Sequence, residues 1–512
     1  MELSRFAVII FFLFPSFLFA QKITFAEHIA PIIFENCTPC HRPNQIAPMP
    51  FTNYEEVSSY ASMIKYVTEI KYMPPWKTVN KNHHFEGERG LSEQEINLIQ
   101  KWVEDGVEEG NPAKTPSVPK FDDAPKIKNP DAIFSMSEAF EQYGVYYDQF
   151  KVFVLPTHLE EEKMVSAIEF VPGNSTIVRS CFISVDTSDR VAALDKWDPT
   201  YGYFSFGEMG FVPNESRWCI WNPLQSKTEF PKGFSKRLPK NAKLLLHIHY
   251  GPTGVPLKDS SEVRIKFSKE KTSRNIQNVP LIHSYNLTNP PFEIPANKTI
   301  RYHAKFVVPF DMELRALMPH SHLLGNTWEI FTVEPQSKKS QVLLKIDDWD
   351  FKWKRQFEFS KPIILKKGTV VHALAQYDNT LKNPSNPSDP PRSMTWGKRM
   401  FEELFLVYFE FVPIIDKENK SILFNPSLVI DGSFDFNFSN SENQKLSLTI
   451  MDFEEKETFS IFQNEGFSKG KQSVKIRMKD LKKGNYFVEL RDENGVVLNR
   501  HIFVNVEKDF LD

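Results

Sequence analysis

The spacing of apolar residues changes along the chain and predicts different structures in successive regions. Up to about residue 112, apolar positions recur every three or four residues, which predicts amphipathic helices and a small all-α domain over residues 21–112. A capping-box pattern precedes each of the two clearest helices. The first has Thr24-x-x-Glu27 with Phe25, Ile29, Ile32 and Ile33, and the second has Ser92-x-x-Glu95 with Ile96, Ile99, Trp102 and Val103.

The rest of the chain has the pattern of β structure. Residues 113–130 are rich in Pro, Lys, Asp and Ser without a regular period, which predicts a linker. Runs of Val, Ile, Phe and Tyr follow, broken by Pro, Asn and Gly, and predict antiparallel β-sandwiches. An Asn494-Gly495 turn between alternating runs indicates a hairpin in a last small β-sandwich, residues 413–512. The clearest predicted strands are residues 151–155, 166–170, 243–250, 299–308, 446–450 and 484–490.

Composition narrows the classes of function. A chain of 512 residues is long enough for several domains, and 41% apolar residues with a formal net charge of -3 are typical of ordinary globular proteins. The sequence has no basic stripe, so we expect no nucleic-acid partner.

Residues 1–20 have the pattern of a secretory signal peptide. The apolar run from Phe6 to Ala20 follows Arg5 and is short for a membrane-spanning helix. An uncleaved anchor is the alternative. Either way, we expect the mature chain outside the cytoplasm, in the periplasm, secreted or at the cell surface. No later apolar run is long enough for a bilayer, so no membrane span is expected after the signal peptide is removed.

The most specific motif is Cys37-Thr38-Pro39-Cys40-His41, which has the C-x-x-C-H spacing of a c-type haem attachment site. Two thiols at this spacing can each add to one haem vinyl group, and the adjacent histidine becomes an axial ligand of the iron. A CxxC pair is otherwise a disulfide or half of a zinc site. We predict covalent haem c held by Cys37, Cys40 and His41.

Met73 is the predicted second axial ligand, in the run Tyr72-Met73-Pro74-Pro75-Trp76. A thioether suits haem iron, and His/Met ligation raises the reduction potential into an electron-transfer range. The two prolines hold the following backbone extended. A lone methionine is more often core filler, but this layout of helices, motif and methionine loop resembles a small monohaem cytochrome c.

Cys181 and Cys219 are the other two of the four cysteines. An oxidising compartment permits them to pair, so we predict a disulfide between them. Such a bond also requires the two backbones to lie at a suitable distance.

Two H-x-H pairs are candidate metal ligands in the β region, His247 with His249 and His320 with His322. Side chains two apart on a strand share a face, so each pair can offer two imidazoles to one copper or zinc ion. The alternative for each pair is a set of hydrogen-bonded core histidines.

Several segments resemble the copper type II, ascorbate-dependent monooxygenases, the family of peptidylglycine hydroxylating monooxygenase and dopamine β-monooxygenase. The resemblance implies two linked antiparallel jelly-roll-type β-domains, residues 131–290 and 291–412, that face each other across a cleft and each hold one copper. Bacterial members of the family often carry an N-terminal cytochrome c. The segments that carry the resemblance are residues 167–174, 249–254, 318–325, 377–379 and 383–387.

The resemblance implies that His320 and His322 bind the second-domain copper, where oxygen and substrate meet. The family's third ligand there is a methionine, and Leu404 stands at that position. Leucine has no lone pair. Met400 and Met394, in the same region of the chain, are the candidate replacements.

The first-domain copper departs further from the family pattern. Its distant histidine carries over to His249, but Arg179-Ser180 stands where the family has an adjacent His-His pair. Arginine stays protonated and repels a cation. A substitute site would have to combine His249 with His247 and Cys181.

The C-terminal region resembles the type IX (Por) secretion sorting domain through the runs 481–488 and 494–497. That domain would take the chain across the outer membrane and is a candidate for removal. The alternative is a plain immunoglobulin-like accessory module.

Three functions are compatible with these motifs. The leading hypothesis is an exported haem c protein that passes electrons to a single copper site at His320 and His322, where oxygen-dependent hydroxylation would occur. The second is a non-catalytic β scaffold for binding or surface display, with only the haem redox active. The third is plain electron transfer with the β-domains used for docking. We expect a redox partner protein or small reductant, and the leading hypothesis adds a small-molecule or peptide substrate that the sequence does not identify.

Overall fold

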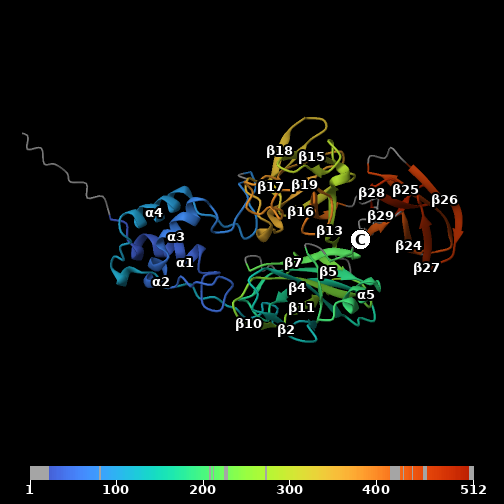
Figure 1. Ribbon diagram of the computed structural model, residues 1–512. Helices are drawn as coiled ribbons and strands as arrows, with labels where there is room; N and C mark the ends of the chain where they lie inside the picture. Colours follow the sequence, from blue (N-terminus) through green and yellow to red (C-terminus); the bar gives the residue numbers. More distant parts are fainter. Residues whose placement is uncertain are drawn as a thin grey trace, which may run out of the picture. The chain divides into compact units, whose positions relative to one another are not determined.

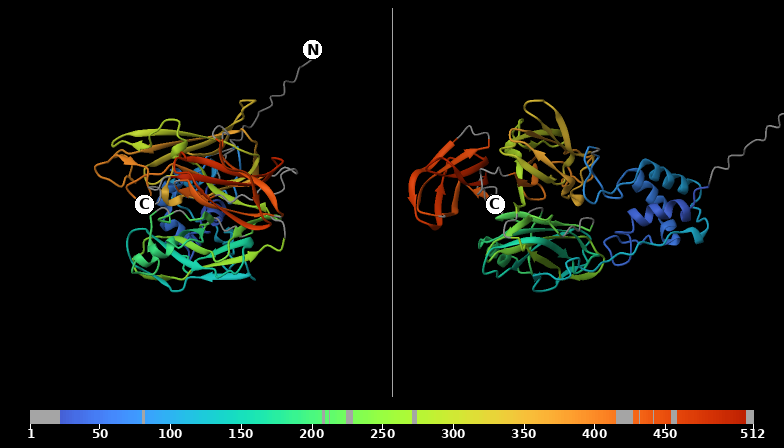
Figure 2. Two further views of the ribbon diagram at one scale, coloured as in Figure 1. Left: turned by 90° about the vertical axis from the view of Figure 1, so that its right-hand side faces the viewer. Right: turned by 180° about the vertical axis from the view of Figure 1, so that it is seen from behind.

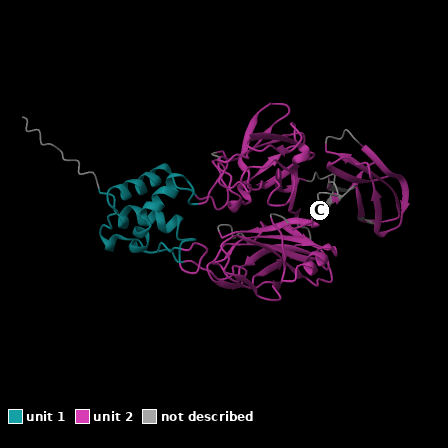
Figure 3. Ribbon diagram, viewed as in Figure 1, with its two compact units in different colours: residues 1–42, 49–74, 90–120 teal, residues 43–48, 75–89, 121–512 magenta. Residues whose placement is uncertain are grey.

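The computed structural model describes residues 22–79, 82–206, 209–211, 213–223, 229–270, 274–414, 427–430, 432–440, 442–453 and 458–506. The predicted signal peptide, residues 1–20, lies outside these ranges. The described chain is mostly β-sheet and divides into two compact units (Figure 3). Of the described residues, the helical unit contains 22–42, 49–74 and 90–120, and the β-rich unit contains 43–48, 75–79, 82–89 and those from 121 to 506.

The helical unit packs around one apolar core that includes Phe25, Ile33, Ile99 and Trp102. Its elements are η1 (Phe25–Ile29), α1 (Ala30–Asn36), α2 (Tyr54–Ser59), α3 (Ala61–Glu69), α4 (Glu93–Glu104) and η2 (Pro112–Lys114).

The two predicted helix caps have different outcomes. At α4 the capping box forms, because the Glu95 N–H donates to Ser92 Oγ (3.3 Å) and the Ser92 N–H donates to the Glu95 carboxylate (2.7 Å). At the first helix the prediction is wrong. The first turn is a π-helix in which the Thr24 side chain caps no backbone group, and the Thr24 N–H donates instead to His28 Nδ1 (3.2 Å).

The first part of the β-rich unit is a sandwich of two five-stranded sheets, coloured cyan to green in Figure 1. The sheets enclose a core that includes Phe153, Ile183 and Leu246. One sheet has the order β1 (Ala132–Ser135), β11 (Glu262–Phe267), β4 (Lys163–Val171), β8 (Phe234–Leu238), β12 (Arg274–Asn275). The other has the order β6 (Tyr203–Phe204), β3 (Gln149–Pro156), β9 (Lys243–Tyr250), β5 (Val178–Asp186), β7 (Glu215–Trp221). Strands β2 (Phe140–Tyr143) and β10 (Pro256–Asp259) form a separate pair, and α5 spans Arg190–Trp197.

The second sandwich has two four-stranded sheets around a large aromatic core. One sheet has the order β13 (Gln277–His283), β22 (Leu406–Pro413), β16 (Met312–His320), β19 (Phe357–Leu365). The other has the order β15 (Thr299–Val307), β20 (Val370–Asp378), β17 (Gly325–Val333), β18 (Ser340–Ile346). A short pair, β14 (Glu293–Ile294) with β21 (Met394–Thr395), and the turns η3 (Ser284–Asn286) and η4 (Phe351–Trp353) complete this part.

The C-terminal part is one seven-stranded sheet, orange to red in Figures 1 and 2. Its order is β26 (Thr458–Phe467), β25 (Gln444–Asp452), β28 (Gly484–Asp492), β29 (Val497–Val506), β23 (Ser427–Ile430), β24 (Ser433–Asn440), β27 (Gly470–Arg477). The predicted hairpin at Asn494-Gly495 joins β28 to β29, and Gly495 has φ +79, which suits glycine in a tight turn. Phe453 and Phe487 from this part belong to the core of the second sandwich, where Phe453 lies 5.7 Å from Phe306.

The described residues contain no helix that is both long and apolar enough to cross a membrane. The last of the chain's passages from the helical unit to the β-rich unit falls between Lys120 and Phe121, inside the predicted linker. Beyond that point the chain is already fixed to the first sandwich, since the N–H groups of Lys126 and Ile127 donate to the Glu169 carboxylate (2.7 and 2.8 Å).

Candidate functional site

The C-x-x-C-H motif continues α1 as a helical turn. The Cys37 N–H donates to the Ile33 carbonyl (2.8 Å), and the N–H groups of Cys40 and His41 donate to the Cys37 carbonyl (3.1 and 2.8 Å). Burial, helped by the neighbouring Cys40, raises the pKa of the Cys37 thiol to about 12. The structure has no disulfide at any of the four cysteines, so Cys37 and Cys40 are not joined to each other.

The His41 ring is fixed from two sides. Its Nδ1 lies 2.9 Å from the Met49 carbonyl oxygen, and its ring stacks on Phe51 with 4.4 Å between centroids and 8° between planes. A carbonyl oxygen can only accept, so Nδ1 carries the proton and Nε2 carries the lone pair. Metal-binding histidines are commonly oriented by such a second hydrogen bond. Nε2 is therefore the ring nitrogen of His41 that has a lone pair to offer a metal ion.

Aromatic contacts connect this histidine to the start of α3. Phe51, which stacks on His41, also lies 5.9 Å from the ring of Tyr60 at the start of α3. Helix α3 and its ends carry further exposed apolar side chains, which a flat, apolar porphyrin would cover if it were bound on this side of the unit. The exposed apolar side chains on α3 and at its ends are Tyr60 (39%), Met63 (55%), Tyr66 (61%), Ile70 (51%) and Tyr72 (39%).

Met73 is half-buried in the helical unit, in the loop that follows α3. Its N–H donates to the Val67 carbonyl (3.0 Å), which fixes its backbone to the last turn of the helix. It lies outside the unit's apolar core, so it is not core filler there.

The first histidine pair lies on one face of β9, as predicted, and both rings are hydrogen-bonded. His247 Nε2 lies 2.8 Å from the Ser205 carbonyl oxygen, and His249 Nε2 lies 2.9 Å from Asp148 Oδ1. The Phe150 ring stacks on His249 at 4.5 Å. These contacts are typical of hydrogen-bonded core histidines, which was the alternative to metal binding for each H-x-H pair.

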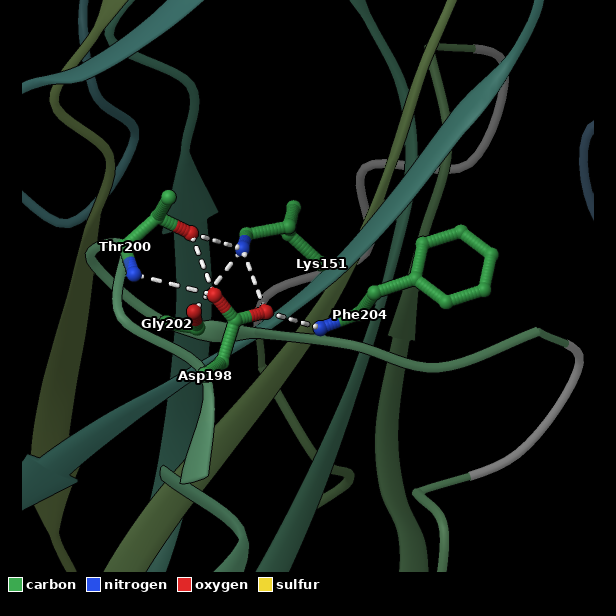
Figure 4. Close-up of polar contacts among 5 residues, drawn as sticks. All are labelled: Lys151, Asp198, Thr200, Gly202 and Phe204. Atoms are coloured by element: carbon green, nitrogen blue, oxygen red, sulfur yellow. Dashed lines mark hydrogen bonds and ion pairs between the residues drawn. The ribbon is translucent and has the colours of Figure 1, made fainter. Parts of the chain in front are cut away.

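A buried lysine network fixes the loop that reaches His247 (Figure 4). Lys151 Nζ donates to Thr200 Oγ1 (2.8 Å) and the Gly202 carbonyl (2.8 Å) and pairs with Asp198 Oδ2 (3.2 Å). Burial alone would raise the pKa of Asp198, but its hydrogen bonds to Thr200 and Lys151 outweigh this and lower the pKa to about 2. The loop is thereby fixed through Phe204, directly before Ser205, whose carbonyl meets His247.

Positive charge lies where the first copper would bind. Asp148, the partner of His249, also has Arg179 Nε at 3.9 Å and Lys352 Nζ at 4.0 Å. Burial alone would raise the pKa of Asp148, but His249, Arg179 and Lys352 hold it below its ordinary value. Ser180 is opposite His249 in the register of β5 and β9, and its hydroxyl does not replace the missing histidine ligands of a copper ion. The residues at this site therefore do not fit a copper ion.

Cys181 does not join this site. It is the register partner of Ile248, and neighbouring residues of a strand point to opposite faces, so Cys181 lies on the face opposite His247 and His249. The predicted Cys181–Cys219 disulfide is also wrong, because neither cysteine is disulfide-bonded. In the register of β5 and β7, Cys181 is opposite Trp221 and Cys219 is opposite Ile183. The two cysteines are thus diagonal neighbours, farther apart than directly opposed residues.

The second pair, His320 and His322, lies at the end of β16 with both side chains fully buried. The ring centroids are 5.7 Å apart and the planes are nearly perpendicular. His322 Nδ1 lies 2.9 Å from the Glu402 carbonyl oxygen, so Nδ1 carries the proton.

The buried carboxylate of Glu403 holds the turn that carries this pair. It accepts from the N–H groups of His322, Leu324 and Leu404. Burial raises the pKa of Glu403 to about 7, although these hydrogen bonds act in the opposite direction.

No third ligand accompanies the second pair at the expected place. Leu404 is buried in an apolar cluster with Met318 and Leu406. Met400 is 41% exposed, and Met394 is buried in a different core cluster, so neither takes the place of the missing ligand. Met318 lies two residues before His320, but its sulfur accepts a hydrogen bond from Arg217 Nη1 (3.2 Å).

Two buried cations lie beside the second pair. Arg217 is 1% exposed and lies between the rings of Phe182 (4.7 Å) and Tyr408 (4.5 Å). Lys354 Nζ lies 3.7 Å from the centre of Phe351, a ring that contacts both histidines. Burial lowers the pKa of His320 well below its ordinary value, and the charges of Arg217 and Lys354 lower it further.

The chemistry of these donors does not fit the copper pair of the monooxygenases. Like charges repel more strongly where water is excluded, so each buried cation opposes a metal ion at the histidines whose protonation it already disfavours. In the part of the chain that the structure describes, no group of three or more His, Cys, Asp and Glu side chains could hold a metal.

Glu403, Lys354 and Arg217 were not predicted from the sequence. The methionine motif near Leu404 could have indicated Glu403, the residue directly before it. Nothing near Lys354 or Arg217 in the sequence signals that either side chain is buried beside a histidine.

The comparisons with known proteins add no family. No family model and no curated protein matches the sequence. A structure of PNGF-II matches at 10% identity and TM-score 0.22, and the match covers 55% of this chain and 65% of that one. The VP2 subviral particle of infectious bursal disease virus matches at 7% identity and TM-score 0.14, over 57% of this chain and 83% of that one. Trypsin-activated alpha-2-macroglobulin from Escherichia coli matches at 10% identity and TM-score 0.13, over 71% of this chain and 24% of that one. TM-scores this low establish no shared fold.

Proposed function

We propose that this chain is an exported c-type haem protein that transfers single electrons. Its helical unit would be the cytochrome c domain, with Cys37 and Cys40 as attachment residues and His41 and Met73 as axial ligands. The observation that best supports this proposal is the hydrogen bond from His41 Nδ1 to the Met49 carbonyl, because it leaves the lone pair of Nε2 for the iron. Haem held in this way supplies a one-electron centre whose potential His/Met ligation raises.

The β-rich unit would be a metal-free relative of the monooxygenases, used for binding or surface display. Its first two sandwiches would then be jelly-roll-type domains that have kept the family's histidine pairs as packing residues. The hydrogen bonds of His247 and His249 and the buried cations Arg217 and Lys354 support this role. Export would use residues 1–20 as the signal peptide, and the C-terminal sheet would be the sorting domain.

Haem attachment is tested in a host that matures c-type cytochromes. We expect one covalent haem per chain by intact mass and by the spectrum of the pyridine complex, and none in the double variant C37A/C40A. His41→Ala should lose the native low-spin spectrum, whereas His84→Ala, at an exposed histidine outside the motif, should keep it. A wild-type protein that is colourless in such a host would overturn the proposal.

A second candidate function keeps one copper at His320 and His322, with hydroxylation of a substrate. The favouring observation is the close, nearly perpendicular placement of two buried rings. Copper analysis of the haem-loaded protein distinguishes the two proposals. Stoichiometric copper that disappears in His320→Ala would favour the second candidate, and absence of copper at every loading would favour the metal-free scaffold.

A further inference from the structure

Strands β26 and β27 are the two edges of the C-terminal sheet. In the described part of the chain, β26 pairs only with β25, and β27 pairs only with β24. An edge strand has a row of backbone N–H and C=O groups on its outer side, and this row is a template for pairing with a further strand. The two edges of this sheet differ in how well they are protected from such pairing.

Edge β26 is irregular, whereas edge β27 is regular. The register of β26 with β25 shifts twice, and Asn464 within β26 has φ +49. Bulges of this kind twist an edge away from further strands. All eight residues of β27 pair with β24 without any shift. Strand β27 is therefore the straight edge of the sheet and the better template.

Edge β27 is also strongly basic. Between Lys469 and Lys483 the chain has seven basic residues and one acidic residue, Asp480, whereas the whole chain has a formal net charge of -3. The exposed side chains of β27 alternate with more buried ones, so they share one face of the strand. These exposed side chains are Lys471, Ser473, Lys475 and Arg477.

Little within the sheet neutralises this basic face. Asp435 of β24 is opposite Lys475 in the register, but no described carboxylate forms an ion pair with Lys471, Lys475 or Arg477. Like charges opposite each other are destabilising, so the face opposes pairing with a second copy of β27. Opposite charges across two strands attract, so the face favours an acidic strand.

A groove of about 650 Å³ lies between the two edges. Phe459 and Ile461 of β26 and Ile476 of β27 line it with apolar side chains, and Lys475 and Arg477 line it with cations. Successive side chains of an extended strand point to opposite faces. A strand laid along β27 would therefore present one set of side chains to the cations and the other set to the apolar lining.

We propose that β27 binds an extended acidic segment of another protein by strand addition. The backbone of the segment would pair with the outer side of β27, its acidic side chains would face the basic face, and its apolar side chains would cover the groove. A flat anionic membrane would use the cations but neither the straight edge nor the groove, so these observations favour a strand. The inference goes beyond the proposed function, because it requires neither haem nor export.

The test measures binding to the full-length protein by fluorescence anisotropy. The labelled probe is a capped peptide of alternating Glu and Val that is as long as β27. We expect saturable binding that weakens as salt is added, and slower hydrogen exchange over residues 470–477. K475E/R477E should weaken binding by about tenfold or more, because attractive contacts across the strands become repulsive. K232E/K240E makes the same change of charge at exposed lysines that flank β8 and should leave binding unchanged.

Two further peptides separate strand addition from general attraction of charges. A peptide that alternates Glu and Pro has the same charge but lacks every second N–H donor. Equal binding of this peptide would overturn the proposal. A peptide that alternates Lys and Val should bind K475E/R477E and not the wild type, which also shows that the variant is folded. Failure of this exchange would overturn the role assigned to the basic face, and the proposal with it.

The remaining outcomes concern the kind of partner. Binding to vesicles of phosphatidylglycerol without binding to the Glu-Val peptide would overturn strand addition and assign the basic face to a membrane. Peptide binding without slower exchange over residues 470–477 would place the peptide elsewhere and would also overturn it. A wild-type protein without covalent haem overturns the proposed function alone, because the peptide assay does not depend on haem.

Discussion

Replacing Lys236 by methionine should destabilise the β-rich unit by removing one partner of a buried ion pair. Lys236 Nζ lies 2.8 Å from Glu410 Oε2 and also donates to the Trp218 carbonyl (2.8 Å). The lysine is 3% exposed and the glutamate 8%. The pair joins β8 of the first sandwich to β22 of the second.

The magnitude follows from this geometry. Two unit charges 2.8 Å apart attract by roughly 6 kcal/mol at an effective dielectric constant of about 20, before the cost of desolvation is subtracted. Removing one partner of a buried pair typically costs about 3 to 5 kcal/mol. Burial alone would raise the pKa of Glu410, but Lys236, Gln356 and Arg315 hold it below its ordinary value. Gln356 and Arg315 remain in Lys236→Met, so we expect a loss near the lower end, about 3 kcal/mol.

Urea unfolding of wild type, Lys236→Met, Glu410→Leu and the double variant completes a double-mutant cycle. The double variant should lose less than the sum of the single losses, because neither charge is left without its partner. The control is Lys366→Met at the exposed pair with Asp311, where a loss of less than ~1 kcal/mol is expected. The reasoning is refuted if Lys236→Met costs no more than this control.

Three further predictions concern pH, the lysine network and metal binding. Burial lowers the pKa of His283 to about 3. As the pH drops, the unfolded chain therefore takes up a proton on this histidine before the folded chain does. The free energy of unfolding should fall between about pH 6.5 and pH 3, by at most ~5 kcal/mol. His283→Phe should flatten this dependence in unfolding curves recorded across that range. Lys151→Met leaves Asp198 half-buried without its cation and should cost about 3 kcal/mol in thermal unfolding. In calorimetric titration, wild type should show no copper binding in the β-rich unit. The double variant K354M/L404M removes a buried cation and adds a thioether, so it should show copper binding.

Local patterns in the sequence predicted much of the secondary structure. The strand predicted at residues 243–250 has those bounds as β9, and the predicted second helix is α4 with its capping box. In both cases the prediction needed only residues that are close in sequence. The alternation of side chains sets the two faces of a strand, and Ser92 and Glu95 bond to each other's backbone within one helical turn. The cap predicted at Thr24 was wrong because a π-turn, which the pattern does not encode, alters the first hydrogen bonds.

The surroundings of the candidate site were harder to predict, because they are formed by contacts between residues that are far apart in the sequence. Thr78 bonds to Lys345 across 267 positions, and no periodicity near residue 78 indicates that partner. The cation beside His320 likewise comes from Arg217, on another sandwich, and is buried through contacts with Phe182 and Tyr408. The composition of a segment shows that an arginine is present, but only the fold shows that its charge lies next to a histidine.

The rings of Phe453 and Phe487 have a consequence for any trimming of the C-terminal sheet. They complete the core of the second sandwich, so cutting that sheet away would uncover the apolar side chains beneath them, at roughly 1.5 to 3 kcal/mol for each ring no longer shielded from water. A chain shortened in this way would therefore expose apolar area on the second sandwich and should aggregate more readily than the intact chain.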